Sequence, residues 1–212
     1  MFRYLVVDDH AILRRGLIEI IEETTDQEVI IDEASCGYEA LQKIQAVDYD
    51  LIFLDISMPG RSGLEILKTI KIEKPDLPVL ILSMYPEEQF ALRALKAGAS
   101  GYLTKESAPD ELKNAINKII AGGNYITPAV SDMLVNDASK FVASQEASHT
   151  QLSDREYSVF LLIATGASLK DISQKLALSD KTISTYRTRI LTKMGLKNNA
   201  QIIAYSIKYN LT

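Results

Sequence analysis

The stretch LIFLD at 51–55 is an unbroken apolar run that ends on an acid. Comparable runs lie at 4–7, 28–34, 79–82 and 101–104, and stretches with apolar residues three or four positions apart separate them. Continuous apolar strands that alternate with amphipathic helices are typical of a parallel sheet covered on both faces. We therefore predict an α/β fold, with a doubly wound sheet of five parallel strands.

Composition excludes several classes of protein. The chain has 212 residues, 47% hydrophobic and 24% charged, which is a globular balance rather than that of a disordered chain. The sequence contains no apolar run near the roughly 18–20 residues that span a bilayer, and acids at 8 and 9 follow too early for a signal peptide. The single cysteine, Cys36, excludes an internal disulfide. We expect a cytoplasmic protein with no membrane partner.

The charge divides the chain into two parts. Residues 149–212 hold nine Lys or Arg against four Asp or Glu, a net charge of +5, which leaves −10 for 1–148. We predict one domain at 1–121, a linker at 122–149 with a helix at about 128–141, and a second, all-α domain of four helices at 150–212. A basic domain beside an acidic one suggests a polyanion as the partner of the basic domain.

Three acids directly follow predicted strands: Asp8 and Asp9 follow the first strand and Asp55 follows the third. In the flavodoxin-like strand order 2-1-3-4-5 these two strands are neighbours, so we expect the three carboxylates to converge at the carboxyl edge of the sheet. Such a cluster favours a hard cation such as Mg²⁺. Lys105 and Ser83 follow the fifth and fourth strands, and they complete a site suited to taking up a phosphoryl group on Asp55.

The sequences VVDDH (6–10), DISMPG (55–60) and GYLTK (101–105) resemble the receiver domain of two-component response regulators. The resemblance covers about residues 1–121. It implies that Asp55 is the phosphoacceptor and a Mg²⁺ ligand, and that Asp9 binds Mg²⁺ directly. Asp8 would bind the ion directly or through a water molecule, and the Ser57 carbonyl would be a further ligand.

The same resemblance assigns roles around the phosphoryl group. Ser83 and Tyr102 match the hydroxyl and the aromatic residue that rearrange on phosphorylation, and Lys105 matches the lysine that stabilises the phosphoryl oxygens. Ser57 and Tyr85 occupy positions that tune the phosphoryl lifetime. We expect the bulky Tyr85 to restrict the attacking water and lengthen that lifetime.

The segment SDKTISTYRTR (179–189) combines helix caps, small hydroxyl side chains and bases on one predicted helix, which suits contacts to phosphates and base edges. Together with LSDRE (152–156) and KMG (193–195) it resembles a LuxR-type helix-turn-helix domain over about 150–212. Ser184 departs from the family, in which a basic residue is common at that position. The residues expected to face base edges are Ser184, Thr185 and Thr188, and those expected near phosphates are Lys181, Thr182, Arg189 and Lys193.

With both domains, the chain resembles a NarL/FixJ-type transcriptional regulator. The resemblance implies a sensor histidine kinase as the phosphoryl donor, a homodimer when phosphorylated, double-stranded promoter DNA as the ligand, and RNA polymerase as a further partner. The receiver would catalyse only its own phosphoryl uptake and hydrolysis, and the chain would not otherwise be an enzyme.

Other functions remain open from sequence. The chain could bind DNA constitutively, without control by phosphorylation. A magnesium-dependent phosphatase that works through an aspartyl phosphate is disfavoured, because Ser57 stands where such enzymes have a second acid. A dinucleotide-binding domain is disfavoured as well, because the first strand is not followed by Gly-x-Gly-x-x-Gly.

Overall fold

The computed structural model describes residues 1–25, 28–142 and 148–211. These form two compact units, Met1–Leu134 and Val135–Thr212, with the division inside helix α6 (Pro128–Val142). Residues 143–147, which belong to the predicted linker, lie outside the described residues. Within the described ranges, no helix is both long and apolar enough to cross a membrane.

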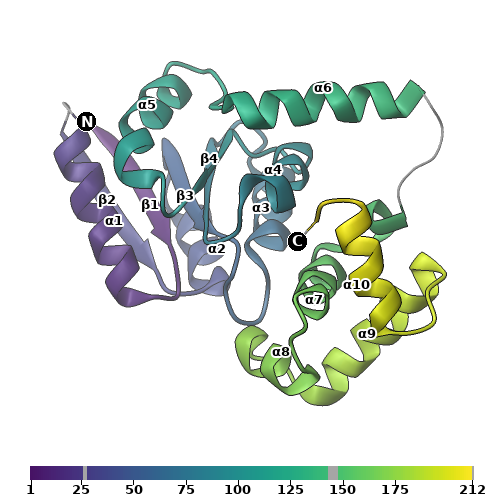
Figure 1. The fold of residues 1–212 in the computed structure, drawn as a ribbon. Helices are drawn as coiled ribbons and strands as arrows, with labels where there is room; N and C mark the ends of the chain where they lie inside the picture. The colour runs from purple at the N-terminus through teal and green to yellow at the C-terminus, as the bar shows by residue number, and fades with distance from the viewer. Residues whose placement is uncertain (26–27, 143–147, 212) are drawn as a thin grey trace. The chain divides into compact units, whose positions relative to one another are not determined.

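The first unit is built on a sheet of five parallel strands in the order β2-β1-β3-β4-β5, which confirms the predicted topology (Figure 1). The strands are β1 (Phe2–Val7), β2 (Val29–Ala34), β3 (Leu51–Asp55), β4 (Val79–Ser83) and β5 (Gly101–Thr104). All residues of β3 and β4 are buried, because helices cover both faces of the sheet. Both strands run one residue further than their apolar runs, so Asp55 and Ser83 are held by the sheet itself.

Five helices cover the sheet: α1 (Ala11–Thr24), α2 (Gly37–Ala46), α3 (Gly63–Glu73), α4 (Glu87–Lys96) and α5 (Ala108–Ile120). Helices α1 and α5 lie against each other on one side of the sheet, and α2 lies against α3 (Figure 1). Alternate strand residues such as Tyr4, Val6 and Phe53 pack in one core cluster with Leu112 and Ile116 of α5. Helix α5 ends as predicted at a glycine in the left-handed region, Gly122 with φ +85°.

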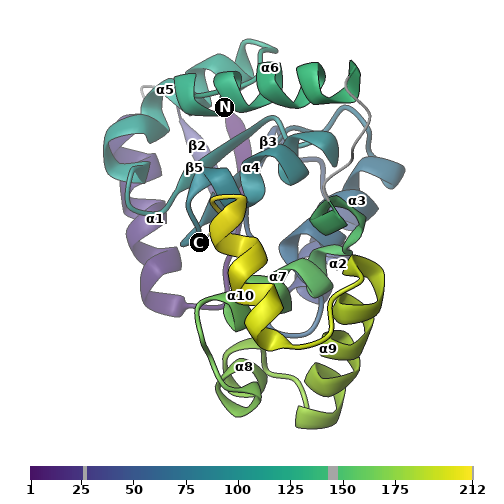
Figure 2. The same ribbon diagram turned by 45° about the vertical axis from the view of Figure 1, so that its right-hand side comes forward.

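The second unit contains a short 3₁₀ turn, η1 (Ser148–Gln151), and helices α7 (Asp154–Ala164), α8 (Leu169–Leu176), α9 (Asp180–Met194) and α10 (Asn199–Lys208) (Figure 2). The predicted capping box is present at the start of α7, where the Ser153 hydroxyl accepts a hydrogen bond from the Glu156 amide. Helix α9 packs against both α7 and α8. Ala177, at φ +50°, ends α8 in a left-handed turn and leads the chain into α9.

Candidate functional site

The three acids predicted to converge do so at the carboxyl edge of the sheet. Asp8 and Asp9 follow β1, Asp55 ends β3, and the two strands are paired with Val7 opposite Leu54. Ligand atoms of Asp8, Asp9 and Asp55, together with one of His10, all lie within 4.8 Å of one another. The parallel register places these groups together, since neighbouring parallel strands end at the same edge.

Lys105 reaches two of these acids from the end of β5. Its Nζ lies 2.6 Å from Asp8 Oδ2 and 3.1 Å from Asp55 Oδ2. Burial raises the pKa of the Asp55 carboxyl; the charge of Lys105 opposes this shift, and the charge of Asp8 adds to it. The lysine is therefore the counter-charge that keeps two buried carboxylates in one pocket.

The buried oxygens of this pocket are suited to a hard cation. Among the described residues, both carboxylate oxygens of Asp55, Oδ1 of Asp9 and Oγ of Ser57 are buried without a hydrogen bond of good geometry. Their nearest charged contacts are Lys105 Nζ, 3.1 Å from Asp55 Oδ2, and His10 Nδ1, 3.2 Å from Asp9 Oδ1. Buried oxygens without partners are costly to a fold, and they are the donor atoms that Mg²⁺ prefers. The residues present therefore fit the magnesium ion that receiver domains generally bind at an acidic pocket.

His10 was not among the residues singled out from sequence. Its Nδ1 lies 3.2 Å from Asp9 Oδ1, and its backbone amide donates to Asp8 Oδ1 at 2.8 Å. The signal available in the sequence was its place directly after the two acids. An exposed histidine at the start of a helix, however, gives no indication of where its ring points.

Ser83 and Tyr102, assigned to the switch, lie near Tyr85, assigned to the phosphoryl lifetime. Ser83 Oγ accepts a hydrogen bond from the Tyr85 amide at 3.1 Å. The Tyr102 hydroxyl donates to the Tyr85 carbonyl at 2.8 Å, and the Tyr102 side chain is only 2% exposed. Burial raises the pKa of Tyr102, so this phenol is neutral at physiological pH. Tyr85 is half-buried and packs against Phe90, with 4.9 Å between ring centroids.

Helix α9 of the second unit carries the predicted nucleic-acid residues. Ser179 caps it by accepting from the Thr182 amide, while Ile183, Ile190 and Met194 are buried. Thr182 is half-buried at this first turn. The exposed residues of the predicted set are Lys181, Ser184, Thr185, Thr188, Arg189 and Lys193. The side chains named for base edges and phosphates therefore lie mainly on the surface of the helix.

Lys193 has a partner that the sequence did not suggest. Its Nζ donates to Glu156 Oε2 at 2.6 Å, which ties the end of α9 to the start of α7. The Glu156 side chain is 4% exposed. Burial alone would raise the pKa of Glu156, but hydrogen bonds from Lys193 and Ser153 outweigh it and hold the pKa below its ordinary value. Lys193 thus has a role inside this unit.

Comparison with known families agrees with both parts of the chain. Residues 4–117 match the response regulator receiver domain, and residues 150–206 match the luxR family of bacterial regulatory proteins. The α/β fold with its acidic pocket and the capped helical unit with its exposed α9 are therefore a receiver and a helix-turn-helix domain in one chain.

Relatives share this arrangement along their whole length. The oxygen regulatory protein NreC of Staphylococcus carnosus is 36% identical over 99% of this chain and 98% of its own. The response regulator GacA of Pseudomonas aeruginosa is 32% identical over 100% and 98%. A solved structure of two RcsB dimers bound to two parallel DNAs is similar at 25% identity and a TM-score of 0.59, covering 96% of each chain.

The chain belongs to the NarL/FixJ-type two-component response regulators and is a transcription regulator controlled by phosphorylation. This family consists of DNA-binding response regulators, which work with histidine kinases, and not of conventional enzymes.

Proposed function

We propose that Asp55 accepts a phosphoryl group from a sensor histidine kinase and that the modified receiver favours a homodimer that binds promoter DNA. The observation that carries the proposal is the Asp55 carboxylate, which is 1% exposed, lies 3.1 Å from the Lys105 ammonium and lies beside two further acids. A carboxylate in this state is available as a nucleophile.

Asp8, Asp9, Asp55 and the main-chain carbonyl of Ser57 would hold Mg²⁺ in this pocket. When bound, the ion neutralises charge on the phosphoryl oxygens. A carboxylate oxygen of Asp55 attacks the phosphorus of a phosphohistidine; the new P–O bond forms as the P–N bond breaks, and the leaving imidazole keeps the electron pair and takes up a proton. Lys105, already 3.1 Å from Asp55 Oδ2, neutralises a phosphoryl oxygen. The receiver would later hydrolyse its own acyl phosphate.

Ser83 and Tyr102 would pass the change at Asp55 to the rest of the receiver. Ser83 Oγ accepts from the Tyr85 amide, and the Ser83 side chain is also hydrogen-bonded to Tyr102, so a phosphoryl oxygen that takes the Ser83 proton would change the contacts of Tyr102. Tyr102 and Ser83 both contact the backbone of Tyr85, which couples the two side chains through one residue. Ser57 and Tyr85 would set the phosphoryl lifetime, because they stand two residues beyond Asp55 and Ser83, the positions that tune it in receiver domains.

Helix α9 would enter the major groove with Ser184, Thr185 and Thr188 toward base edges, and Lys181, Thr182, Arg189 and Lys193 toward phosphates. A single half-site gives weak binding, and a twofold dimer on a pseudo-palindromic site roughly doubles the contacts. We place the receiver at 1–121, the linker at 122–149 and the DNA-binding domain at 150–212. Contact with RNA polymerase would follow promoter binding, inside the cytoplasm.

The test uses the full chain, its Asp55→Asn variant and, as a matched control, Asp76→Asn at an exposed position of the same unit. Each protein is incubated with acetyl phosphate and Mg²⁺, weighed by intact mass spectrometry, and used to select DNA sequences. We expect one added phosphoryl group and tighter DNA binding for the wild type and the control, and neither for Asp55→Asn. If DNA affinity is equal in every condition, the protein binds DNA constitutively and phosphorylation does not control it.

A further inference from the structure

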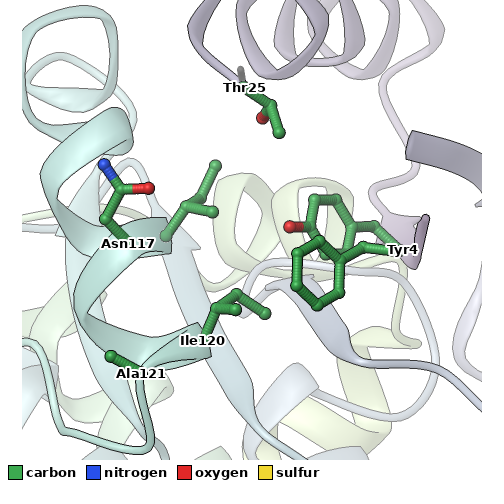
Figure 3. A pocket seen from close by; sticks show the side chains of 7 residues that line it. Tyr4, Thr25, Asn117, Ile120 and Ala121 are labelled. Carbon is green, nitrogen blue, oxygen red and sulfur yellow. The ribbon is translucent and has the colours of Figure 1, made fainter. Parts of the chain in front are cut away.

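Tyr4 and His10 are two polar side chains of the receiver that the proposed function does not use. The Tyr4 hydroxyl is buried without a hydrogen-bond partner among the described residues, and Tyr4 is 0% exposed beside a pocket at the end of α5 (Figure 3). A hydroxyl that is fully enclosed cannot meet a ligand. The His10 side chain is 60% exposed, and its Nδ1 lies beside the acids at the carboxyl edge of the sheet. Of the two, only His10 is placed to bind a ligand.

The backbone holds the His10 ring at the acidic pocket. His10 is the N-cap of α1, and its amide donates to Asp8 Oδ1 at 2.8 Å. Its Nδ1 lies 3.2 Å from Asp9 Oδ1 and 3.4 Å from Asp8 Oδ1. Asp55, which is 1% exposed, adds oxygens that are buried without hydrogen bonds of good geometry. The His10 nitrogen is therefore a fourth donor in a cluster whose ligand atoms lie within 4.8 Å of one another.

The imidazole and the ammonium of the pocket contact different oxygens of Asp8. Lys105 Nζ lies 2.6 Å from Asp8 Oδ2, whereas the His10 contacts are to Asp8 Oδ1. A cation that binds Asp8 Oδ1 and Asp9 Oδ1 therefore lies beside the ring nitrogen. The three carboxylates and the ammonium carry a formal charge of −2, which a divalent ion neutralises. An imidazole that binds a metal ion is uncharged and leaves this balance as it is.

The distances around Nδ1 are close to those between ligands of one metal ion. Octahedral ligands at about 2.1 Å from an ion lie about 3.0 Å from their neighbours and about 4.2 Å from the opposite ligand. The two Nδ1–oxygen distances, 3.2 and 3.4 Å, exceed the neighbour spacing by only a few tenths of an ångström. A small contraction would bring the nitrogen and both oxygens onto one ion.

A nitrogen donor changes which ion the pocket prefers. Mg²⁺ takes oxygen ligands and keeps several waters, whereas imidazole suits Fe²⁺, Ni²⁺ and Zn²⁺. We propose that His10 is a ligand for a divalent transition-metal ion in this pocket and raises the affinity for such ions relative to Mg²⁺. The inference rests on the metal pocket of the proposed function and adds the residue that selects the ion. Mg²⁺ in the same pocket leaves the ring unbound.

The experiment uses the full chain without a histidine tag, and Co²⁺ is the probe because its paramagnetism shifts the NMR signals of its ligands. Calorimetry gives the dissociation constants of Co²⁺ and Mg²⁺. His10→Phe keeps a ring and removes the donor nitrogen. We expect it to weaken Co²⁺ binding about tenfold, to change Mg²⁺ binding less than about twofold, and to abolish the shifted imidazole signals. Circular dichroism verifies that the variant folds.

His149→Phe is the matched control, because His149 is the other histidine of the chain and lies in the second unit. Its ring packs against Tyr157 and Tyr205, so a phenylalanine keeps the packing. This variant should bind both ions as the wild type does and keep the shifted signals. If His149→Phe loses those signals instead, the nitrogen ligand is His149 and the inference is overturned.

The Mg²⁺ measurements separate this inference from the proposed function. If the wild type binds Mg²⁺ and His10→Phe weakens both ions equally or neither, His10 does not select the ion, and only the inference is overturned. If the wild type binds neither ion, the acidic pocket is not a metal site, and the inference is overturned together with the ion of the proposed function.

Discussion

The helices of the two units begin in different ways. All four helices α7–α10 start with a side chain that accepts a backbone amide hydrogen bond, and among α1–α5 only α3 does. The capping residues of the second unit are Ser153, Ser168, Ser179 and Asn198. The helical unit thus satisfies its polar groups locally. The receiver instead is organised by a buried sheet, and it leaves oxygens without partners at the edge where Asp55 lies.

The difference follows from what each unit does. Phosphoryl uptake needs oxygens that are buried but not already hydrogen-bonded, and only a large core can offset their cost. Reading DNA needs exposed side chains on a rigid helix, which caps and a small core supply. Stability should therefore respond to ions and buried charge in the receiver, and to single caps and one ion pair in the helical unit.

The largest expected effect is at Lys105. Lys105→Met leaves Asp8 and Asp55 without their counter-charge, so in magnesium-free buffer the receiver should lose about 3 kcal/mol of unfolding free energy. Lys74→Met is the control, because Lys74 pairs with the fully exposed Asp48 and should cost less than about 1 kcal/mol. Urea titration followed by near-ultraviolet circular dichroism measures both. If Lys105→Met and Lys74→Met lose equal unfolding free energy, Lys105 does not act as the counter-charge of the buried acids.

The second largest effect is that of Mg²⁺, which should raise the stability of the receiver and not that of the helical unit. At about a hundredfold excess over its dissociation constant, the ion should stabilise the receiver by about 2.7 kcal/mol and leave the helical unit unchanged. Asp9→Asn removes one of the clustered carboxylates and should reduce the gain. Hydrogen exchange with and without Mg²⁺ resolves the units in one sample. If Mg²⁺ raises the protection of backbone amides equally in both units, the ion does not bind specifically at the acidic pocket of the receiver.

A single cap should matter in the helical unit. Ser168→Ala removes the hydroxyl that accepts from the Asp171 amide at the start of α8, and it should cost about 1 kcal/mol. Ser184→Ala, at an exposed position inside α9, should change stability by less than about 0.5 kcal/mol. Thermal unfolding by far-ultraviolet circular dichroism compares the two. A neutral Ser168→Ala would mean that packing alone holds α8.

The smallest effect concerns the Glu156–Lys193 pair and its pH dependence. The pKa of Glu156 is held below its ordinary 4.5, so the pair stabilises the fold fully above that pH and loses its contribution as the pH falls through the lower value. Lys193→Met should therefore cost about 0.5–1 kcal/mol at pH 7 and progressively less below pH 4.5. Lys181→Met, at an exposed position of the same helix, should show no such trend. Urea titrations at several pH values provide the comparison.

Much of the receiver could be predicted from sequence because its signals are local. The continuous apolar runs predicted all five strands, and the acids that end two of them predicted the pocket at one edge of the sheet. The roles of Asp55, Ser83 and Tyr102 in phosphorylation, and those of the α9 side chains in DNA binding, stay predictions that the experiments above address. The sequence could not predict the direction of the His10 ring, because a side-chain rotamer depends on neighbours that are distant in the chain.

Contacts between residues that are distant in the sequence could not be predicted either. Glu156 and Lys193 are 37 positions apart, and the sequence offered Lys193 only as an exposed base on a helix. The same holds for Tyr4, which looks like an ordinary strand aromatic. Its unpaired hydroxyl becomes evident only when α5 and the end of α1 are in place around it.

Local periodicity and strand-end residues determined that this chain forms a five-stranded parallel sheet with a carboxylate cluster, followed by capped helices. Hydrophobic patterning is a property of short stretches of the chain, so it can be recognised without coordinates. The tertiary structure alone decided that Lys105 spans Asp8 and Asp55, that Lys193 is tied to Glu156, and that the Tyr4 hydroxyl is buried without a hydrogen-bond partner among the described residues. Those features depend on distances between atoms of separate elements, which packing sets and the linear order does not.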